Sequence, residues 1–421
     1  MDDQAANVLR ESRLSISGWK TFLAVMGPGL VVMLADTDVG SIITAAQSGV
    51  QWSYQLLLLQ ILLMPVLYIV QELTVRLGIF TGKGHGDLIR STFGGGWAWV
   101  SVAGLGVATV GALITEFSGV AGVGELFGVP RAISLTIATA LLLAIVLTGS
   151  YRRVERVAIA LGLFELAFFV VAWRAHANGA ELMSGLAHMP LKDPAYLYLV
   201  AANIGAVIMP WMIFYQQSAI ADKKLRAEHY RHAQCDTAVG AVISQAVMAA
   251  VLIAAAATIG KEHAAASLNS IGDITKMLVP ALGADVGRVV FGFGTIGAGM
   301  VAAIVVSLAS AWGFGEVTGY RHSLEHHPLD APWFYGIYAL AVVGGAVIVD
   351  LVPDLVALNV GVEVMNALML PLVLGFLVLL AFKALPPDRR LRGPYAWLVV
   401  AVSVLTAGLG VYGGISGAHL L

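Results

Sequence analysis

Long apolar stretches recur along this chain from one end to the other, and they limit its possible folds more than any other feature of the sequence. Each stretch has about 20 residues or more, the length of a helix that crosses the roughly 30 Å hydrocarbon core of a bilayer. Because lipid offers no partner for a free backbone amide or carbonyl, such stretches are expected to be helices. Only 12% of the residues are charged, about half of the roughly 25% found in soluble proteins. The sequence therefore predicts an all-α membrane protein.

Charged residues, glycines and prolines divide the apolar stretches into eleven predicted spans. The spans lie near residues 21–50, 54–78, 96–127, 131–149, 154–175, 195–220, 236–260, 285–316, 332–350, 355–382 and 394–416. Lysine and arginine separate by side, since the connections on the side of the N-terminus hold 18 of the 24 basic residues and the opposite side holds 6. The positive-inside rule then predicts a cytoplasmic N-terminus and an external C-terminus. We expect the membrane to be a bacterial inner membrane.

The remaining bulk features exclude several classes of function. A net charge of −2 gives no support for a nucleic-acid partner. The single cysteine, Cys235, excludes an intramolecular disulfide and a CxxC metal site. Residues 1–20 lack the short apolar core and the cleavage site of a signal peptide, so we expect a cytoplasmic tail. No HExxH or GxSxG motif occurs, and we do not expect an enzyme.

Two of the predicted spans contain features that interrupt a helix. The first span has two carboxylates and a glycine among apolar residues at positions 36–41. The sixth span has Pro210, which lacks a backbone donor, directly after Met209. Breaks in spans one and six of eleven are typical of two inverted five-helix repeats, whose unwound segments meet at the membrane midplane.

This placement of the breaks predicts the domain organisation. The predicted parts are a cytoplasmic tail over 1–20, a ten-helix core over 21–382, and a cytoplasmic loop with an eleventh helix over 383–421. Within the core, repeat one covers about 21–175 and repeat two about 195–382. The halves share no convincing residue-level identity, so the repeat is inferred from the breaks alone.

A carboxylate near the bilayer centre costs several kcal/mol unless it faces water or a counter-charge. A bound cation would neutralise Asp38, and the second break adds carbonyls around Ala206 and the thioether of Met209. Oxygen ligands suit Mg²⁺ and Mn²⁺, whereas a thioether favours softer transition metals. Mixed ligands therefore favour Mn²⁺ or Fe²⁺. Two plainer interpretations stay open: Met209 as core filler, and Asp36 as a helix-end group or gate contact.

Five short motifs carry a resemblance to a known family. They occupy residues 27–29 (Gly-Pro-Gly), 38–41 (Asp-Val-Gly-Ser), 76–79 (Arg-Leu-Gly-Ile), 81–83 (Thr-Gly-Lys) and 206–210 (Ala-Val-Ile-Met-Pro). In order and spacing the chain resembles the NRAMP family of divalent metal transporters (natural resistance-associated macrophage proteins), as a divergent branch. The likeness runs from span one to about span ten.

The resemblance implies a LeuT-like fold with spans one and six unwound at the midplane. It implies that Asp38 and Met209 bind the metal by their side chains and that Ala35 and Ala206 contribute backbone carbonyls. Ser41 stands where the family has asparagine and reaches less far, so the ligand shell is expected to be looser. The metal would be the substrate, with no other cofactor, and we expect the protein to function as a monomer.

Several departures from the family concern proton transfer. Trp211 replaces the histidine expected after Met-Pro, and Gln216 stands in place of a second one; neither exchanges a proton near neutral pH. Span three keeps one family acid as Glu116 and has Gly119 in place of the other, and the span at 332–350 has no arginine. We therefore expect transport with weak or no proton coupling.

Span ten adds two candidates, because Asn366 and Met369 lie one helical turn apart and both could face the site. Asn366 could donate to Asp38 or to a metal-bound water, or form a plain interhelical hydrogen bond. The short Ser41 and the missing histidines also fit a roomier site for a partly hydrated ion. Mg²⁺, which dehydrates reluctantly, is therefore an alternative substrate, although Met209 argues against it.

Two further alternatives belong to other functional classes. The same fold carries Na⁺-coupled organic solute symporters, but the two acids at the first break would repel a substrate carboxylate. The second alternative is a membrane sensor that binds metal without flux. A transport assay separates both from a metal transporter.

Overall fold

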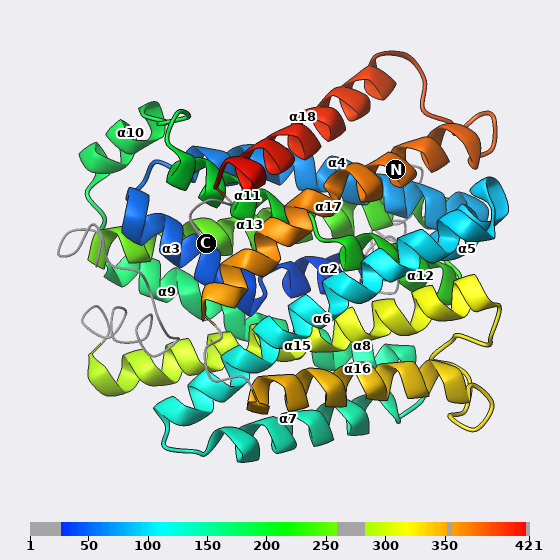
Figure 1. Ribbon diagram of the computed structural model, residues 1–421, viewed down its shortest axis with the longest axis horizontal. Coiled ribbons are helices and arrows are strands. Elements are labelled where there is room, and N and C mark those ends of the chain that lie inside the picture. The colour runs from blue at the N-terminus through cyan, green and yellow to red at the C-terminus, as the bar shows by residue number, and fades with distance from the viewer. Residues whose placement is uncertain (1–26, 259–282, 352–355, 418–421) are drawn as a thin grey trace, which may run out of the picture.

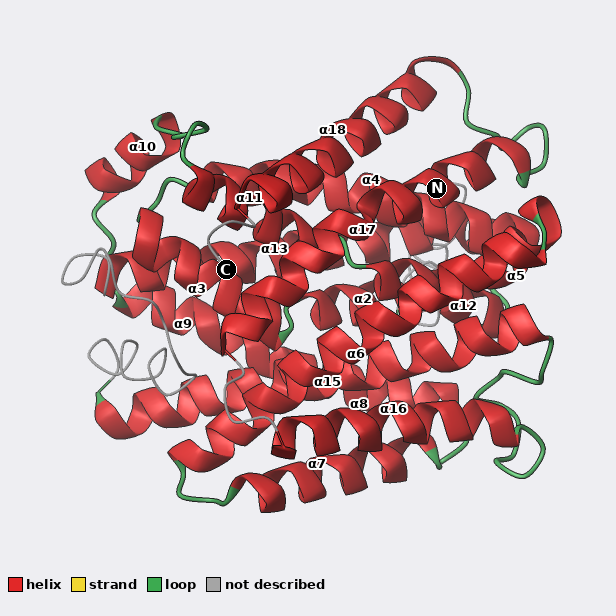
Figure 2. Ribbon diagram, in the orientation of Figure 1, coloured by secondary structure: helices red, strands yellow, loops and turns green. Residues whose placement is uncertain are grey.

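The computed structural model describes residues 27–258, 283–351 and 356–417. Within these residues the chain forms helices joined by loops, with no strand (Figure 2). The predicted tail over 1–20 lies outside the described residues. So do residues 261–282, in the connection between the predicted spans 236–260 and 285–316.

The helices of the first half follow the predicted order. They are α2 (Pro28–Asp36), α3 (Val39–Trp52), α4 (Leu57–Thr81), α5 (His85–Phe93), α6 (Gly95–Leu126), α7 (Arg131–Val146), α8 (Tyr151–Gly162), the 3-10 turn η1 (Leu163–Leu166), α9 (Ala167–Arg174) and α10 (Gly179–Ala187). The pair α2 and α3 forms the first span, and α8, η1 and α9 together form the fifth. The short helices α5 and α10 lie between spans.

The helices of the second half also follow the predicted order. Its helices are α11 (Pro194–Val207), α12 (Pro210–Asp222), the turn η2 (Ala227–His229), α13 (Tyr230–Thr258), α15 (Ala284–Thr318), α16 (Pro332–Leu351), α17 (Val356–Lys383) and α18 (Gly393–Gly417). In the described part of the chain, nine helices are long and apolar enough to cross a membrane, and the bent pair of α2 and α3 makes a tenth. The apolar α7, at 16 residues, completes the eleven predicted spans.

Proline and capping residues set the helix starts that matter for the site. Pro28, Pro194 and Pro210 occupy the first turn of α2, α11 and α12, where a missing amide hydrogen costs nothing. Asp193 caps α11 by accepting hydrogen bonds from the next helical amides at 2.8 and 3.3 Å. Helix α4 ends at Gly82, whose positive φ of 64° closes the last turn. These boundaries follow from local sequence.

The connections lie at two opposite ends of the bundle. Figure 1 shows α5 and the loop between α17 and α18 at one end, and α10 at the other. Both connections at the first end are among those that carry the excess of lysine and arginine in the sequence. The arrangement therefore agrees with the predicted separation of charge.

The broken spans lie at the centre of the bundle. The most apolar part of the span α11–α12 is 94% buried, whereas that of α18 is 39% buried. In Figure 1, α2 and α12 run through the middle, while α7, α16 and α18 lie at the edges. The outer helices thus turn apolar faces to lipid, and most polar residues in the central spans are buried inside the protein.

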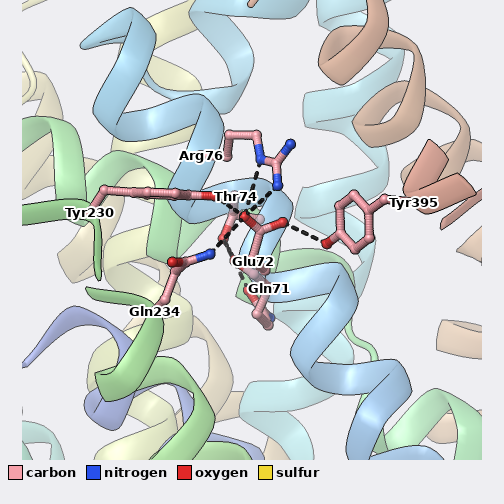
Figure 3. A network of polar contacts seen from close by, with 7 residues as sticks. All are labelled: Gln71, Glu72, Thr74, Arg76, Tyr230, Gln234 and Tyr395. Atoms are coloured by element: carbon pink, nitrogen blue, oxygen red, sulfur yellow. Dashed lines mark hydrogen bonds and ion pairs between the residues drawn. The ribbon is translucent and has the colours of Figure 1, made fainter. Parts of the chain in front are cut away.

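The eleventh span, α18, packs against α11 and α17, and Tyr395 near its start also contacts Glu72 of α4 (Figure 3). This carboxylate accepts hydrogen bonds from Arg76 at 2.9 and 3.1 Å, from Tyr395 of α18 at 2.8 Å, from Gln234 at 3.3 Å and from the hydroxyl of Tyr230. The guanidinium of Arg76 also lies 5.2 Å from the ring centre of Tyr395. Glu72 therefore has a paired charge and a structural role.

Candidate functional site

The first span is bent by 47° where α2 gives way to α3. Asp38 has an extended backbone there, with φ −70° and ψ 173°, and its Oδ1 accepts a hydrogen bond from the Ser41 amide at 2.7 Å. Asp38 is therefore the N-cap of α3, a position that aspartate favours because its carboxylate satisfies a free helical amide. Its other oxygen, Oδ2, is buried, and the carboxyl group of Glu116 lies within hydrogen-bonding reach of the Asp38 side chain.

The sixth span breaks at Ile208 and Met209, between α11 and α12. Met209 is extended, with φ −99° and ψ 145°, as expected for a residue that precedes proline. Carbonyls in the last turn of α11, including that of Ala206, lack helical partners. The side chain of Met209 is fully buried, so its thioether is available only to groups inside the bundle.

The two breaks meet through a direct hydrogen bond. The hydroxyl of Ser41, on the first turn of α3, donates to the carbonyl oxygen of Ala206 at 3.0 Å. Ala35 lies in the last turn of α2, where carbonyls again lack helical partners, and it is fully buried. The structure thus brings the ends of four half-helices together, although the two breaks are more than 160 residues apart in the sequence.

Two further carboxylates surround the N-terminus of α3. Glu116 of α6 accepts a hydrogen bond from the Val39 amide at 3.2 Å. Glu363 of α17 lies over Gly40, where an added Cβ would come within 2.2 Å of its Oε1. Asn366 holds this carboxylate by donating to Glu363 Oε2 at 3.0 Å. The positive end of the α3 dipole stabilises these anions.

Two more acids lie at the first break. Asp36 accepts a hydrogen bond from the Ser244 hydroxyl and one from the Gln245 amide at 3.4 Å, both on α13. Glu165 of η1 accepts a hydrogen bond from the Thr37 hydroxyl. Asp36 therefore contacts α13.

Five acids thus lie around one helix break, and each is at most 1% exposed. They are Asp36, Asp38, Glu116, Glu165 and Glu363. Among residues 27–258, 283–351 and 356–417, no lysine or arginine forms an ion pair with any of them. A buried carboxylate with no counter-charge is costly in a low-dielectric interior. The site therefore requires protons or cations for neutrality.

A metal at this centre could not be held by acids and histidines alone. In the part of the chain that the structure describes, no three His, Cys, Asp or Glu side chains are arranged to hold a metal ion. Carbonyl oxygens from the broken helices and the Met209 thioether are the donors that could complete a coordination shell around Asp38. Such a mixed set is compatible with a divalent transition metal.

The other predicted residues have different surroundings. Gln216 joins three helices, since it accepts from Thr74 of α4 at 2.5 Å and donates to Thr237 of α13 at 2.8 Å. Trp211 is fully buried in α12, and its ring nitrogen makes no hydrogen bond with the described residues. Met369 packs against α6 at Gly104. Of the two candidates on span ten, Asn366 is the one that contacts an acid at the break.

Glu363 and Glu165 are the acids at the break that sequence reasoning did not place. The sequence did carry a signal, because each is a lone acid inside an otherwise apolar span. Gly119, where the second acid of span three is missing, faces Val39: an added Cβ would lie 2.4 Å from Val39 Cγ2. An acid at this position would have no room in the present packing.

A polar cavity of about 310 Å³ lies at the end of α12 that is remote from the break. Its lining includes Asp87, Asp222, Glu316 and His322. Helix α12 has 13 residues, so this cavity is roughly 20 Å from Met209. Asp38 and Met209 themselves are fully buried, which makes the centre closed to solvent on both sides.

Sequence comparison gives a consistent set of relatives. The family model of natural resistance-associated macrophage protein-like proteins matches residues 29–416. The chain is 31% identical over 323 residues to the divalent metal cation transporter MntH of Pectobacterium carotovorum, with 74% of this chain and 75% of that protein covered. It is 27% identical over 305 residues to the protein of the same description from Bradyrhizobium diazoefficiens, with 69% and 67% covered.

Solved structures share the fold. The model resembles the Eremococcus coleocola manganese transporter with a TM-score of 0.79 and 20% identity, with 96% of this chain and 89% of that chain covered. It also resembles a transporter of the nucleobase-cation-symport-1 family, with a TM-score of 0.61 and 15% identity, covering 94% and 91%.

Proposed function

Because this chain belongs to the family of natural resistance-associated macrophage protein-like transporters, we propose that it carries a divalent metal cation across a membrane. The family resemblance drawn from the sequence is confirmed, and so is the all-α, LeuT-like fold with eleven spans. The ion, the ligands and the transport cycle are proposals, and the contacts at the helix breaks support them.

The proposed ligands are the Asp38 carboxylate, the Met209 thioether, the carbonyls of Ala35 and Ala206, and the Ser41 hydroxyl. The observation that carries the proposal is that the Asp38 carboxylate is fully buried at the helix break, beside the Glu116 carboxyl group and without a basic partner among the described residues. A divalent cation between the breaks would supply the missing positive charge. The contact of Ser41 with Ala206 supports it, because it brings both broken spans to one point.

The transport cycle is proposed to be alternating access around this centre. The closed centre would open to one side when the half-helices α2 and α12 tilt, because each joins its partner through an extended segment rather than through a continuous helix. The polar cavity at the far end of α12 would receive the ion on its way out. With the N-terminus in the cytoplasm, as the distribution of basic residues suggests, this direction is import.

Mn²⁺ and Fe²⁺ are the proposed substrates, because the thioether of Met209 favours softer ions. Mg²⁺ is the second candidate, and one observation favours it: Glu116 and Glu363 add carboxylates around the N-terminus of α3. A hydrated Mg²⁺ binds through carboxylates and water, with no need for sulfur. The two substrates differ in their dependence on Met209.

Proton coupling is proposed to be weak or absent. Gln216, in the place of a family histidine, has both ends of its amide engaged in hydrogen bonds between helices. Trp211 carries no group that titrates near neutral pH. Glu116 is one of the acids beside the break that could still accept a proton.

The decisive experiment is metal uptake into dye-loaded proteoliposomes. Asp38→Ala is expected to abolish uptake, whereas Glu72→Gln, which alters a buried acid with an arginine partner, should retain it. Met209→Ala should weaken Cd²⁺ binding and shift selectivity toward Mg²⁺. Uptake that survives Asp38→Ala would end this assignment. Metal binding without flux would instead identify a sensor, and stabilisation by amino acids rather than metals would identify an organic solute symporter.

A further inference from the structure

The side of the first break that faces α13 has its own set of oxygen groups. Asp36 is the last residue of α2, and it accepts hydrogen bonds from Ser244 and Gln245 of α13. Glu165, on η1 of the fifth span, accepts one from Thr37. Because Asp36 and Thr37 are neighbours in the chain, Glu165 lies beside the segment that carries Asp36.

Three oxygen atoms in this set have no hydrogen-bond partner among the described residues. They are Asp36 Oδ1, Glu165 Oε1 and Gln245 Oε1. Each belongs to a side chain that is at most 1% exposed. Buried polar atoms almost always have a hydrogen-bond partner. Three acceptors without one, on three neighbouring side chains, indicate a ligand that accepts electron pairs, such as a cation.

Other buried acids of this protein show what a satisfied carboxylate looks like. Glu72 is paired with Arg76, and Glu155 of α8 is paired with Lys223 at 2.8 Å. Asp36 and Glu165 differ from both, because their described partners are neutral hydroxyls and one amide.

We propose that Asp36, Thr37, Glu165, Ser244 and Gln245 form a second cation site, which binds a hard cation through oxygen ligands alone. The set offers carboxylate, hydroxyl and amide oxygens and contains neither sulfur nor imidazole, which is the donor chemistry that Na⁺-like and Mg²⁺-like ions prefer. The site is distinct from the centre at Asp38 and goes beyond the proposed transport of a divalent metal. Its ion would link α2 to α13 and to the fifth span.

This position gives the second ion a defined effect on the first. Only Thr37 separates Asp36 from Asp38 in the sequence, so a cation at Asp36 would lie close to the Asp38 carboxylate. A cation held by Asp36 and Glu165 therefore weakens the attraction of Asp38 for a divalent metal, because like charges repel strongly in a low-dielectric interior. Binding of either ion is therefore expected to weaken binding of the other.

The test uses the Asp38→Asn variant, in which the first centre is disabled and the α3 cap is retained. Its thermal denaturation in detergent is followed while choline chloride is replaced by NaCl or MgCl₂ at constant ionic strength. We expect one of the two ions to raise the midpoint temperature with saturation. Adding Asp36→Asn, Glu165→Gln or the milder Ser244→Ala should raise the half-saturating concentration at least tenfold. Glu72→Gln is the matched control and should leave it unchanged.

Several results would overturn the second site. The first is a midpoint temperature that neither ion raises. The second is a rise that survives both Asp36→Asn and Glu165→Gln. The third is a rise that a change of pH reproduces with no dependence on the ion, which would mean that Asp36 and Glu165 bind protons only. The ion with the lower half-saturating concentration identifies the occupant. Stabilisation of the unmodified protein by Cd²⁺ reports on the first centre, so its absence would count against the proposed function and not against this site.

Discussion

Gly40→Ala tests whether Glu363 lies over the first turn of α3. A Cβ at position 40 would be 2.2 Å from Glu363 Oε1 and 3.3 Å from its Cδ. The first distance is too short for any contact, so the carboxylate has to move. Asn366 opposes this movement, because its amide donates to Glu363 Oε2 at 3.0 Å.

Two terms of opposite sign set the size of the effect. Replacing a helical glycine by alanine stabilises a protein by about 0.5–1 kcal/mol. Loss of a hydrogen bond to a charged group costs about 1.5–3 kcal/mol. The second term is larger, so Gly40→Ala should lower the free energy of unfolding by about 1–2 kcal/mol. With Glu363→Ala already in place, the obstacle is gone and the same substitution should be neutral or stabilising.

The measurement is a double-variant cycle, in which the unfolding free energy is followed by titration with a denaturing detergent in mixed micelles. Gly375→Ala is the control on α17, since an added Cβ there would meet no atom within 4 Å. If Gly40→Ala were as stable as the unmodified protein, or equally destabilising with and without Glu363, the carboxylate would not lie where the structure places it.

Three further predictions use the same titration. Asp38→Asn should change the free energy of unfolding by less than about 1 kcal/mol, because asparagine caps a helix as well as aspartate does, yet it should abolish metal uptake; a stability loss as large as that of Asp38→Ala would contradict the separation of cap and charge. Asp236→Ala leaves the buried amides of Gly27 and Gly29 without their acceptor and should cost about 2–4 kcal/mol, whereas an equally stable variant would exclude this role of Asp236 at the start of α2. Burial lowers the pKa of His85, at the start of α5, to about 4, whereas a free histidine titrates near 6.5. The unfolded chain therefore binds more protons between these two pH values, and protonation favours unfolding. The contribution of His85 to the free energy of unfolding is fully present above pH 6.5, and about 3 kcal/mol is lost as the pH falls to about 4. His85→Gln should flatten this part of the stability profile, and an unchanged slope would assign it to other groups.

The membrane-spanning architecture was largely determined by the sequence. Each apolar stretch has to form a helix because lipid offers no other partner for the backbone, so the helices of the described residues follow the predicted spans, most of their boundaries within a few residues. The predicted interruptions of spans one and six are likewise present. Asp38 and Pro210 act locally, as a cap and as a residue without an amide donor, and such effects can be predicted without knowledge of the packing.

Only the tertiary structure decided which acids surround the break. Glu165 and Glu363 were visible as lone acids in apolar spans, but the helical repeat fixes only which residues share a face and not which neighbouring helix that face meets. Gln216 illustrates the same limit, because its replacement of a family histidine was visible, whereas its contacts with α4 and α13 depend on packing. The hydrogen bond between Ser41 and Ala206 also joins segments that lie far apart in the chain. The side-chain environment of a helix is set by its rotation about its own axis within the bundle, and this rotation results from the packing of all the spans together.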